Sequence, residues 1–309
     1  MSVRWRKLGH VYCAENDHAW SKSHAYCPTA FVLADGERIR VLCAFMDGDR
    51  VGRCGWVDVA AENPTRVLGV SSLPALDVGV PGTFDEHGVT PLSLVHLPDG
   101  VIRLYYAGWQ RGVGVRYTLF LGAAESDDEG SSFRRLSQAP LLDRSDGELN
   151  TRSSALVVPA NGCWRMWYAG GSDWIGSGAD AKPQYALRHL WSEDGLVWPR
   201  NGEVCLEPRP GELGFARPCV RHRDGTLHMW YSLRTVQRVY DLGYATSIDG
   251  IEWQRRDDAS GLQRGPAGSW DADMVGLSCL VDVGSSLLMF YNGNGYGATG
   301  FGVALAEAD

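Results

Sequence analysis

A short pattern of aromatic and small residues recurs along the chain at an interval of about sixty residues. Residues 105–108 read Tyr-Tyr-Ala-Gly, residues 167–170 read Trp-Tyr-Ala-Gly, and related aromatic runs lie at 230–232 and 290–293. The same interval leads back to the apolar run at 41–45. Self-similarity at a fixed period of this length is typical of propellers and solenoids. The pattern therefore predicts five copies of one unit.

Each unit has a recognisable order of strands. An apolar strand, such as 93–97, ends in an Asp-Gly turn and precedes the aromatic strand. A third strand, rich in small residues, follows as at 121–126 and in most copies runs into an Asp-Gly or Asp-Glu-Gly hairpin signal. A fourth strand, as at 133–136 and 252–256, alternates an aromatic residue with cations, which is typical of an edge. Each unit is thus predicted to be a four-stranded blade.

The last unit lacks its outer strand, because the sequence ends just after the third strand at 301–306. Residues 3–7, Val-Arg-Trp-Arg-Lys, have the outer-strand pattern and precede the first complete unit. We therefore expect the N-terminal strand to pair with the C-terminal blade and close the ring, which removes an exposed edge. The predicted fold is an all-β, five-bladed β-propeller. No Pro/Gly/Ser-rich linker divides the repeats, so residues 1–309 are predicted to form a single domain.

Composition narrows the possible partners. The net charge of −8 argues against nucleic acid and anionic membranes, which require basic surfaces. The sequence has no signal-like N-terminal segment and no stretch near the ~20 apolar residues of a membrane span, so we expect a cytoplasmic protein. The eight cysteines show no CxxC spacing, and most lie in apolar strands, which favours buried free thiols. A small-molecule or neutral glycan ligand fits these properties best.

In a propeller the first strands line a central channel, so residues where these strands begin should converge there. Four of the five strand starts carry a carboxylate: Asp85, Glu148, Glu212 and Asp271. Carboxylates that repel one another in a desolvated channel raise the pKa of at least one of them. Glycoside cleavage requires an acid and a second carboxylate of this kind. The alternative is a structural role, because Asp and Glu commonly cap backbone amides at turns.

Several segments resemble a group of intracellular glycosidase-like five-bladed proteins: residues 23–25, 82–85, 105–109, 270–271 and 291–297. The group is similar in architecture to arabinanases, β-xylosidases, invertases and levansucrases. This resemblance implies a triad of a first-blade base or nucleophile, a carboxylate that tunes pKa, and a Glu proton donor near the fourth blade. Glu212 matches the donor, but the first blade offers Ser23 and His24 where the aspartate is expected. We therefore assign Asp85 as base or nucleophile, with Asp47 as its rival, and Asp271 as the tuning carboxylate.

Further candidates for substrate contact lie near the predicted channel mouth. His24 is a candidate acid, metal ligand or hydrogen-bonded structural residue. Arg152 and Arg217 could hold a carboxylate or phosphate, or neutralise Glu148 and Glu212. The loop aromatics could stack on sugar faces, and the Asn-Gly asparagines could bind hydroxyls or simply form turns. The remaining candidates are His87, Trp109, Trp174, Asp273, Asn292, Asn294 and Tyr296. The loop at 171–184, which carries Trp174, is predicted to be a lid.

The predicted function is that of a glycoside hydrolase or transglycosylase acting on a small glycoside or sugar-containing intermediate, without a cofactor. One alternative is a phosphorylase, in which arginines bind phosphate as the attacking group. Another is a non-hydrolytic sugar-binding protein or biosynthetic tailoring enzyme, which the missing first-blade aspartate favours. No metal site is predicted, although a channel cation remains open.

Overall fold

The computed structural model describes residues 3–160, 162–178 and 181–307, and nearly all regular structure in it is β-strand. The strands form consecutive antiparallel groups. Blade 1 contains β2 (Ser23–Val32), β3 (Arg38–Met46), β4 (Gly52–Ala60) and β5 (Val67–Val70). Blade 2 contains β6 (Val89–His96), β7 (Ile102–Arg111), β8 (Tyr117–Ser126) and β9 (Arg134–Arg135). Blade 3 contains β10 (Thr151–Ala160), β11 (Cys163–Ile175), β12 (Lys182–Ser192) and β13 (Glu203–Leu206).

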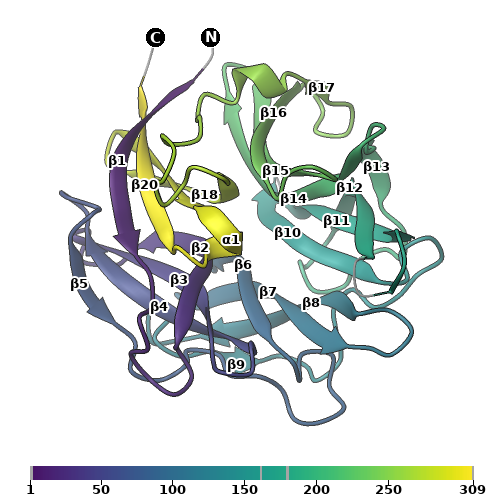
Figure 1. Cartoon of the computed structure of the whole chain (residues 1–309), viewed down its shortest axis with the longest axis horizontal. Helices are drawn as coiled ribbons and strands as arrows, with labels where there is room; N and C mark the ends of the chain where they lie inside the picture. Colours follow the sequence, from purple (N-terminus) through teal and green to yellow (C-terminus); the bar gives the residue numbers. More distant parts are fainter. Residues whose placement is uncertain (1–2, 161, 179–180, 308–309) are drawn as a thin grey trace.

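The remaining strands complete the ring. Blade 4 contains β14 (Glu212–Arg223), β15 (Thr226–Thr235), β16 (Asp241–Ser247) and β17 (Gln254–Arg255), followed by the short 3-10 helix η2 (Asp257–Ala259). Blade 5 contains β18 (Gly276–Val283), β19 (Ser286–Asn292), β20 (Phe301–Glu307) and the N-terminal strand β1 (Arg4–Tyr12), with the one-turn helix α1 (Asn294–Gly297) between β19 and β20. The groups follow one another around a common centre in sequence order, and β1 lies beside β20 (Figure 1).

The predicted outer strand at the N-terminus pairs as expected and is longer than expected. β1 runs antiparallel to β20 from Arg4 opposite Glu307 to Tyr12 opposite Phe301. Trp5 is buried in this ladder and its ring packs edge-on against that of Trp230 in blade 4, with 5.6 Å between the ring centroids. The propeller-type all-β fold predicted from the sequence period is therefore confirmed.

Aromatic side chains from the second strands fill the spaces between blades. Tyr106, Tyr168, Tyr231 and Tyr291 occupy corresponding places in β7, β11, β15 and β19, and all four are fully buried. Their rings pack in separate apolar clusters that join neighbouring blades. The recurring aromatic pair seen in the sequence is thus the packing unit of the propeller, because each blade must bury an apolar face against the next.

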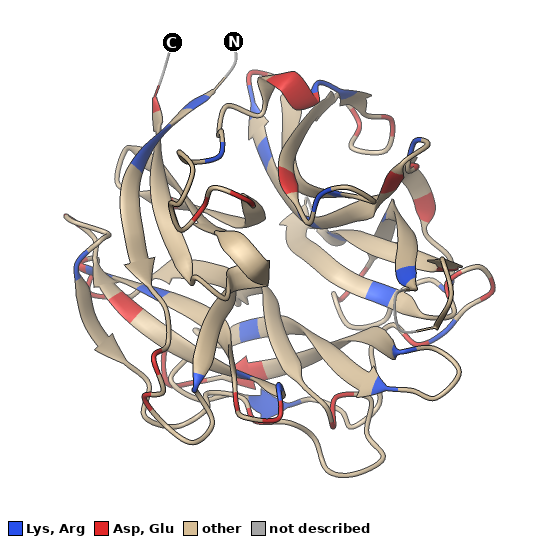
Figure 2. Ribbon diagram, in the orientation of Figure 1, with Lys and Arg blue, Asp and Glu red and all other residues tan. Residues whose placement is uncertain are grey.

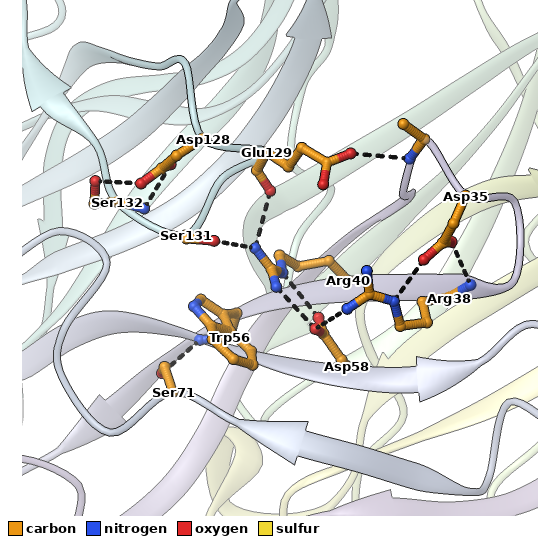
Figure 3. A network of polar contacts seen from close by, with 11 residues as sticks. Asp35, Arg38, Arg40, Trp56, Asp58, Ser71, Asp128, Glu129, Ser131 and Ser132 are labelled. Atoms are coloured by element: carbon orange, nitrogen blue, oxygen red, sulfur yellow. Dashed lines mark hydrogen bonds and ion pairs between the residues drawn. The ribbon is translucent and has the colours of Figure 1, made fainter.

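Polar contacts also lock adjacent blades together, and Figure 3 shows the junction between blades 1 and 2. Arg40 of β3 makes two 2.8 Å bonds to the Asp58 carboxylate of β4, and its other Nη donates to the Glu129 carbonyl (3.0 Å) and to Ser131 Oγ (2.7 Å) in the hairpin of blade 2. The Arg40 guanidinium also lies over the Trp56 ring. These buried charges are fully paired within the blades.

The Asp-Gly hairpins predicted from the sequence serve the same purpose at the next two junctions. Tyr105 of blade 2 donates to the Gly195 carbonyl in blade 3 (2.8 Å), and Trp167 of blade 3 donates to the Gly250 carbonyl in blade 4 (2.7 Å). In the Gly195 turn, Asp194 accepts backbone bonds that hold the hairpin shape. The repeated turn therefore fixes the spacing between blades.

Candidate functional site

A cavity of about 660 Å³ lies at the centre of the ring, where first strands begin and second strands end. Every blade contributes to its wall: Tyr26 from β2, Thr90 from β6, Ser153 from β10, Ala216 from β14 and Leu277 from β18. This is the end of the channel at which sequence reasoning placed the site. A cavity of this size accommodates a small ligand of one or a few sugar rings.

Bulges in the first strands shape the cavity wall. The antiparallel register shifts at a corresponding place in each first strand, as between Ser153 and Leu156 of β10. Cys27, Ser154 and Leu277 lie at these bulges with φ between 50° and 55° and line the cavity. A bulge redirects a side chain that regular pleating would place elsewhere, so the bulges present side chains to the channel axis.

One side of the cavity is aromatic. Trp109 at the end of β7 donates from Nε1 to Thr90 Oγ1 (2.9 Å), and its ring centroid lies 5.1 Å from that of Tyr117. The Trp174 ring packs edge-on against Tyr117 from behind, at 5.4 Å. Indole and phenol faces fixed in this way suit the C–H faces of sugars.

Tyrosines also surround Arg234, which lies at the end of β15. The Arg234 guanidinium lies 5.8 Å from the Tyr296 ring centroid, and the Tyr185 and Tyr240 hydroxyls are 2.9 Å apart. Burial would lower the pKa of Arg234, but the surrounding tyrosines Tyr185 and Tyr240 outweigh this effect and raise it. Burial raises the pKa of Tyr117 to about 12. The Arg234 guanidinium therefore remains charged and the Tyr117 phenol remains protonated at neutral pH.

Two histidines, His24 and His87, also line the cavity. His24 has φ of 67°, an uncommon value for a non-glycine residue, and its Nδ1 lies 2.8 Å from Ser23 Oγ. Burial lowers the pKa of His24, and the charge of Arg50 lowers it further. His87 Nδ1 accepts a 3.4 Å bond from the Arg111 backbone. His24 is therefore a neutral imidazole near pH 7, able to accept a proton.

The cavity carries an excess of positive charge. Four arginines line it, Arg50, Arg111, Arg116 and Arg234, but among the described residues Asp49 is its only carboxylate. None of the four forms an ion pair within residues 3–160, 162–178 and 181–307. Elsewhere acidic and basic residues are interspersed over the ring (Figure 2). The local charge of the cavity is thus opposite to the net charge of −8.

The expected convergence of carboxylates on the cavity is not found, because each carboxylate is bonded within its own blade. Asp85 is fully buried and accepts from Tyr106 Oη (3.0 Å) and Arg135 Nε (2.7 Å). Glu148 accepts from Tyr168 Oη (2.8 Å) and Arg152 Nε (2.9 Å). Neither carboxylate lines the cavity.

Glu212 and Asp271 have the same kind of environment. Arg255 holds Glu212 through two bonds of 2.9 and 2.8 Å, and Asp271 contacts Lys7 of β1 and accepts from Tyr291 Oη (3.0 Å). Burial would raise both carboxyl pKa values, but these cationic partners outweigh burial and lower them. A lowered pKa is the reverse of what a proton donor at neutral pH requires. The catalytic roles of Asp85, Glu212 and Asp271 stay predictions, and the lowered pKa disfavours Glu212 as the proton donor.

Asp47, Arg152 and Arg217 also have partners within the protein. Asp47 shapes the turn between β3 and β4 by accepting from the backbone of Asp49 and Val51, both at 2.9 Å. Besides holding Glu148, Arg152 donates to two backbone carbonyls. Arg217 is buried and reaches across the ring axis, donating to the Pro28 carbonyl of blade 1 (2.6 Å) and the Pro91 carbonyl of blade 2 (3.3 Å). These contacts make Arg217 a tie between blades rather than a lining residue.

The two asparagines expected to bind sugar hydroxyls have their side chains occupied by backbone groups. Asn292 is fully buried, accepts from the Cys27 amide (2.7 Å) and donates to the Ala25 carbonyl (2.7 Å), so it joins blade 5 to blade 1. Asn294 accepts from the Asp273 amide (2.7 Å). Asn292, Asn294 and Asp273 do not line the cavity.

Four of the predicted residues do come together around the cavity: His24, His87, Trp109 and Tyr296. The predicted lid at 171–184 is instead largely a continuation of β11 and β12, with Trp174 opposite Pro183 in the ladder. Residues 179–180 of that segment lie outside the described residues. Trp174 therefore supports the wall through Tyr117.

Sequence reasoning missed Tyr117, Tyr185 and Tyr240, and all four arginines of the cavity, Arg50, Arg111, Arg116 and Arg234. All lie at strand ends or in the loops next to them at the cavity end. The position of Arg234 just after the aromatic run at 230–232 corresponds to that of Trp109 after 105–108, and this repeat register could have identified it.

Neither a membrane span nor a metal centre is found in the described part of the chain. Its helices are too short to cross a bilayer, and no three His, Cys, Asp or Glu side chains are grouped to hold an ion. The cytoplasmic location and the possible channel cation stay predictions.

The fold is that of glycosidase-like propellers. A glycosyl hydrolase from Bacteroides ovatus has a TM-score of 0.71 and 14% identity, covering 99% of this chain and 94% of its own. A thermostable family-43 glycoside hydrolase has a TM-score of 0.64 and 16% identity, with coverage of 92% and 88%. An α-L-arabinofuranosidase from Lactobacillus brevis has a TM-score of 0.67 and 11% identity, with coverage of 91% and 90%. The predicted relation to this clan is confirmed at the level of fold.

No family model matches the sequence. The chain belongs to the same protein family as two Mycobacterium tuberculosis proteins, uncharacterized protein MT1551 of strain CDC 1551 and uncharacterized protein Rv1502 of strain H37Rv. Each is 33% identical over 306 residues, which span 99% of this chain and 100% of the relative.

Proposed function

We propose that the protein binds a small sugar-containing ligand in the central cavity and acts on its glycosidic bond as an enzyme of glycosidase type. The observation that carries this proposal is the aromatic wall of Trp109 and Tyr117 in a cavity of about 660 Å³, within a fold shared with glycoside hydrolases. Stacking on such a wall is a common means of holding a sugar ring.

The acid–base chemistry is assigned to groups that line the cavity. His24 is neutral near pH 7 and can take a proton from a water or hydroxyl that attacks the anomeric carbon. As the bond to the leaving oxygen breaks, that oxygen takes a proton from His87, the other imidazole that lines the cavity. The ion-paired carboxylates Asp85, Glu212 and Asp271 maintain the blades in this proposal.

A phosphorylase is the second candidate, because four cavity arginines have no carboxylate partner among the described residues. In that reaction a phosphate oxygen replaces water as the group that bonds to the anomeric carbon. Product formation that depends on added phosphate would identify it.

The experiment is product-resolved NMR on a panel of glycosides, sugar phosphates and sugar nucleotides, with and without phosphate. We expect His24→Gln to reduce turnover by roughly 10²–10⁴-fold, the range for loss of a general base. Trp109→Ala should weaken binding about tenfold, from the loss of one stacking face. Trp191→Ala is the matched control, because Trp191 is an exposed indole of β12 outside the cavity wall.

The pH dependence provides a second measurement. His24 must be deprotonated to accept a proton, so kcat/KM should fall as pH decreases through a value below 6.5. Turnover that is unchanged in both His24→Gln and Trp109→Ala would overturn the cavity assignment. Binding without product across the panel would favour a non-hydrolytic sugar-binding protein.

A further inference from the structure

The cavity presents positive charge that the protein itself leaves without a counter-charge. Arg116 and Arg234 line the cavity near Tyr296. Burial raises the pKa of Tyr296, and the charges of Arg234 and Arg116 partly offset that rise. Neither has an ion-pair partner in the part of the chain that the structure describes. Arg234 is half-buried and Arg116 is exposed, so a ligand in the cavity can reach both, and a partly desolvated guanidinium without a counter-charge usually faces an anion.

The tyrosines around Arg234 orient this charge but do not neutralise it. Tyr185 and Tyr240 are bonded to each other through their hydroxyls (2.9 Å), and Tyr296 contacts the guanidinium through its ring. Phenol hydroxyls in this setting are donors that an oxyanion can accept from. The wall therefore combines two permanent cations with neutral donors.

A further feature points to a ligand at the same place. Ser153 is fully buried and lines the cavity, and its hydroxyl has no hydrogen-bond partner among the described residues. This favours a ligand with acceptor oxygen atoms, because an unused buried donor is uncommon in a folded protein.

We propose that the cavity binds an oxyanion, a phosphate or carboxylate group, against Arg116 and Arg234, so that the ligand is an anionic sugar or a sugar bound together with free phosphate. The sugar part of this inference rests on the proposed function, whereas the anion part does not. Arg is well suited to the role, because its planar fork binds phosphate and carboxylate in a bidentate manner.

Four probes separate the sources of the anion: inorganic phosphate, glucose 1-phosphate, glucuronate and methyl glucoside. Titration calorimetry of each against the full chain at low ionic strength gives the affinities. We expect at least one anionic probe to bind at least tenfold more tightly than methyl glucoside, and to weaken as salt is raised. Binding of inorganic phosphate alone indicates free phosphate, whereas binding of glucuronate without phosphate indicates a carboxylate on the sugar.

Substitutions of the two arginines test where the anion binds. Arg234→Gln and Arg116→Gln should each weaken the anionic probe at least tenfold, whereas Arg234→Lys, which retains the charge, should weaken it less. The matched control is Arg134→Gln, because Arg134 is exposed on β9, has no carboxylate partner among the described residues and lies outside the cavity. Thermal unfolding of every variant establishes that it is folded.

The two proposals fail in different ways. If anions bind through Arg234 but no sugar binds or reacts, the proposed function is wrong and the anion site stands. If neutral glycosides bind and turn over equally well in wild type and Arg234→Gln, the anion site is wrong and the function stands. Absence of binding by all three anionic probes at ~50 mM, or equal loss in Arg134→Gln, also overturns the anion site.

Discussion

Within the blades, the buried carboxylates Asp85, Glu148 and Asp271 each lie against a cation and a tyrosine hydroxyl. In the central cavity the situation is reversed, because four arginines share a wall with the single carboxylate of Asp49. The charged groups within the blades form ion pairs with one another, so removing one of them should reduce the stability of the fold. The arginine charges in the cavity are available to a ligand, so removing one of them should weaken binding.

The largest expected effect comes from breaking a blade pair. Glu148→Gln leaves the Arg152 guanidinium buried without its counter-charge, which should reduce the free energy of unfolding by about 3–5 kcal/mol. Urea unfolding measures the loss. Asp146→Asn is the control, because Asp146 is an exposed carboxylate of the same segment and should change stability by less than about 0.5 kcal/mol. Unchanged stability combined with lost turnover in Glu148→Gln would restore a catalytic reading of the blade carboxylates.

A smaller effect is expected on acidification. The folded-state pKa values of Asp271 and Glu212 lie below their usual values of 3.8 and 4.5. Their contribution to stability is therefore complete above about pH 4.5 and is lost as pH falls through the lowered folded values. Urea midpoints between pH 7 and 3 should decrease mainly below pH 4.5, and Asp271→Asn should flatten that decrease. A variant with the same pH slope as wild type would show that this carboxylate is not stabilised by Lys7.

The smallest effect on stability is expected in the cavity. Arg234→Gln removes a half-buried charge that has no ion-pair partner among the described residues, although nearby tyrosines raise its pKa, so the stability of the ligand-free protein should change by less than about 1 kcal/mol. Urea unfolding without ligand measures this directly beside Glu148→Gln. A loss of several kcal/mol would instead assign Arg234 to the framework, as a cation held by its tyrosines.

The sequence predicts the packing of the blades but not the partners of the charged residues. The sixty-residue aromatic period predicted the blades, and the pattern at 3–7 predicted the pairing of β1, because burial and edge exposure leave local signatures. The partners of charged residues leave no such signature. Arg135 and Asp85 lie 50 positions apart, and Lys7 and Asp271 lie 264 apart. Sequence position could indicate that a carboxylate begins a strand, but not which cation would meet it.

Among the candidate residues at strand ends, some line the cavity as predicted and others do not. Trp109 and His24 line the cavity because the channel mouth is set by the fold, which the repeat defines. Asn292 does not, because bulges in the first strands bring the Cys27 amide within reach of its side chain. Bulges at a few backbone positions therefore decide which of the predicted residues line the cavity.

The pairing of β1 with β20 has a consequence for how the chain is made. Arg6 and Glu307, which bond across this ladder, are 301 positions apart, so the ribosome completes β20 on the order of 15–60 s after β1. During that time Trp5 and Lys7 have no blade to join. Pairing of β1 with β20 must therefore wait until β20 has been made, and it joins two segments whose synthesis is separated by that interval. This interval is when a holding chaperone would be most useful to the protein.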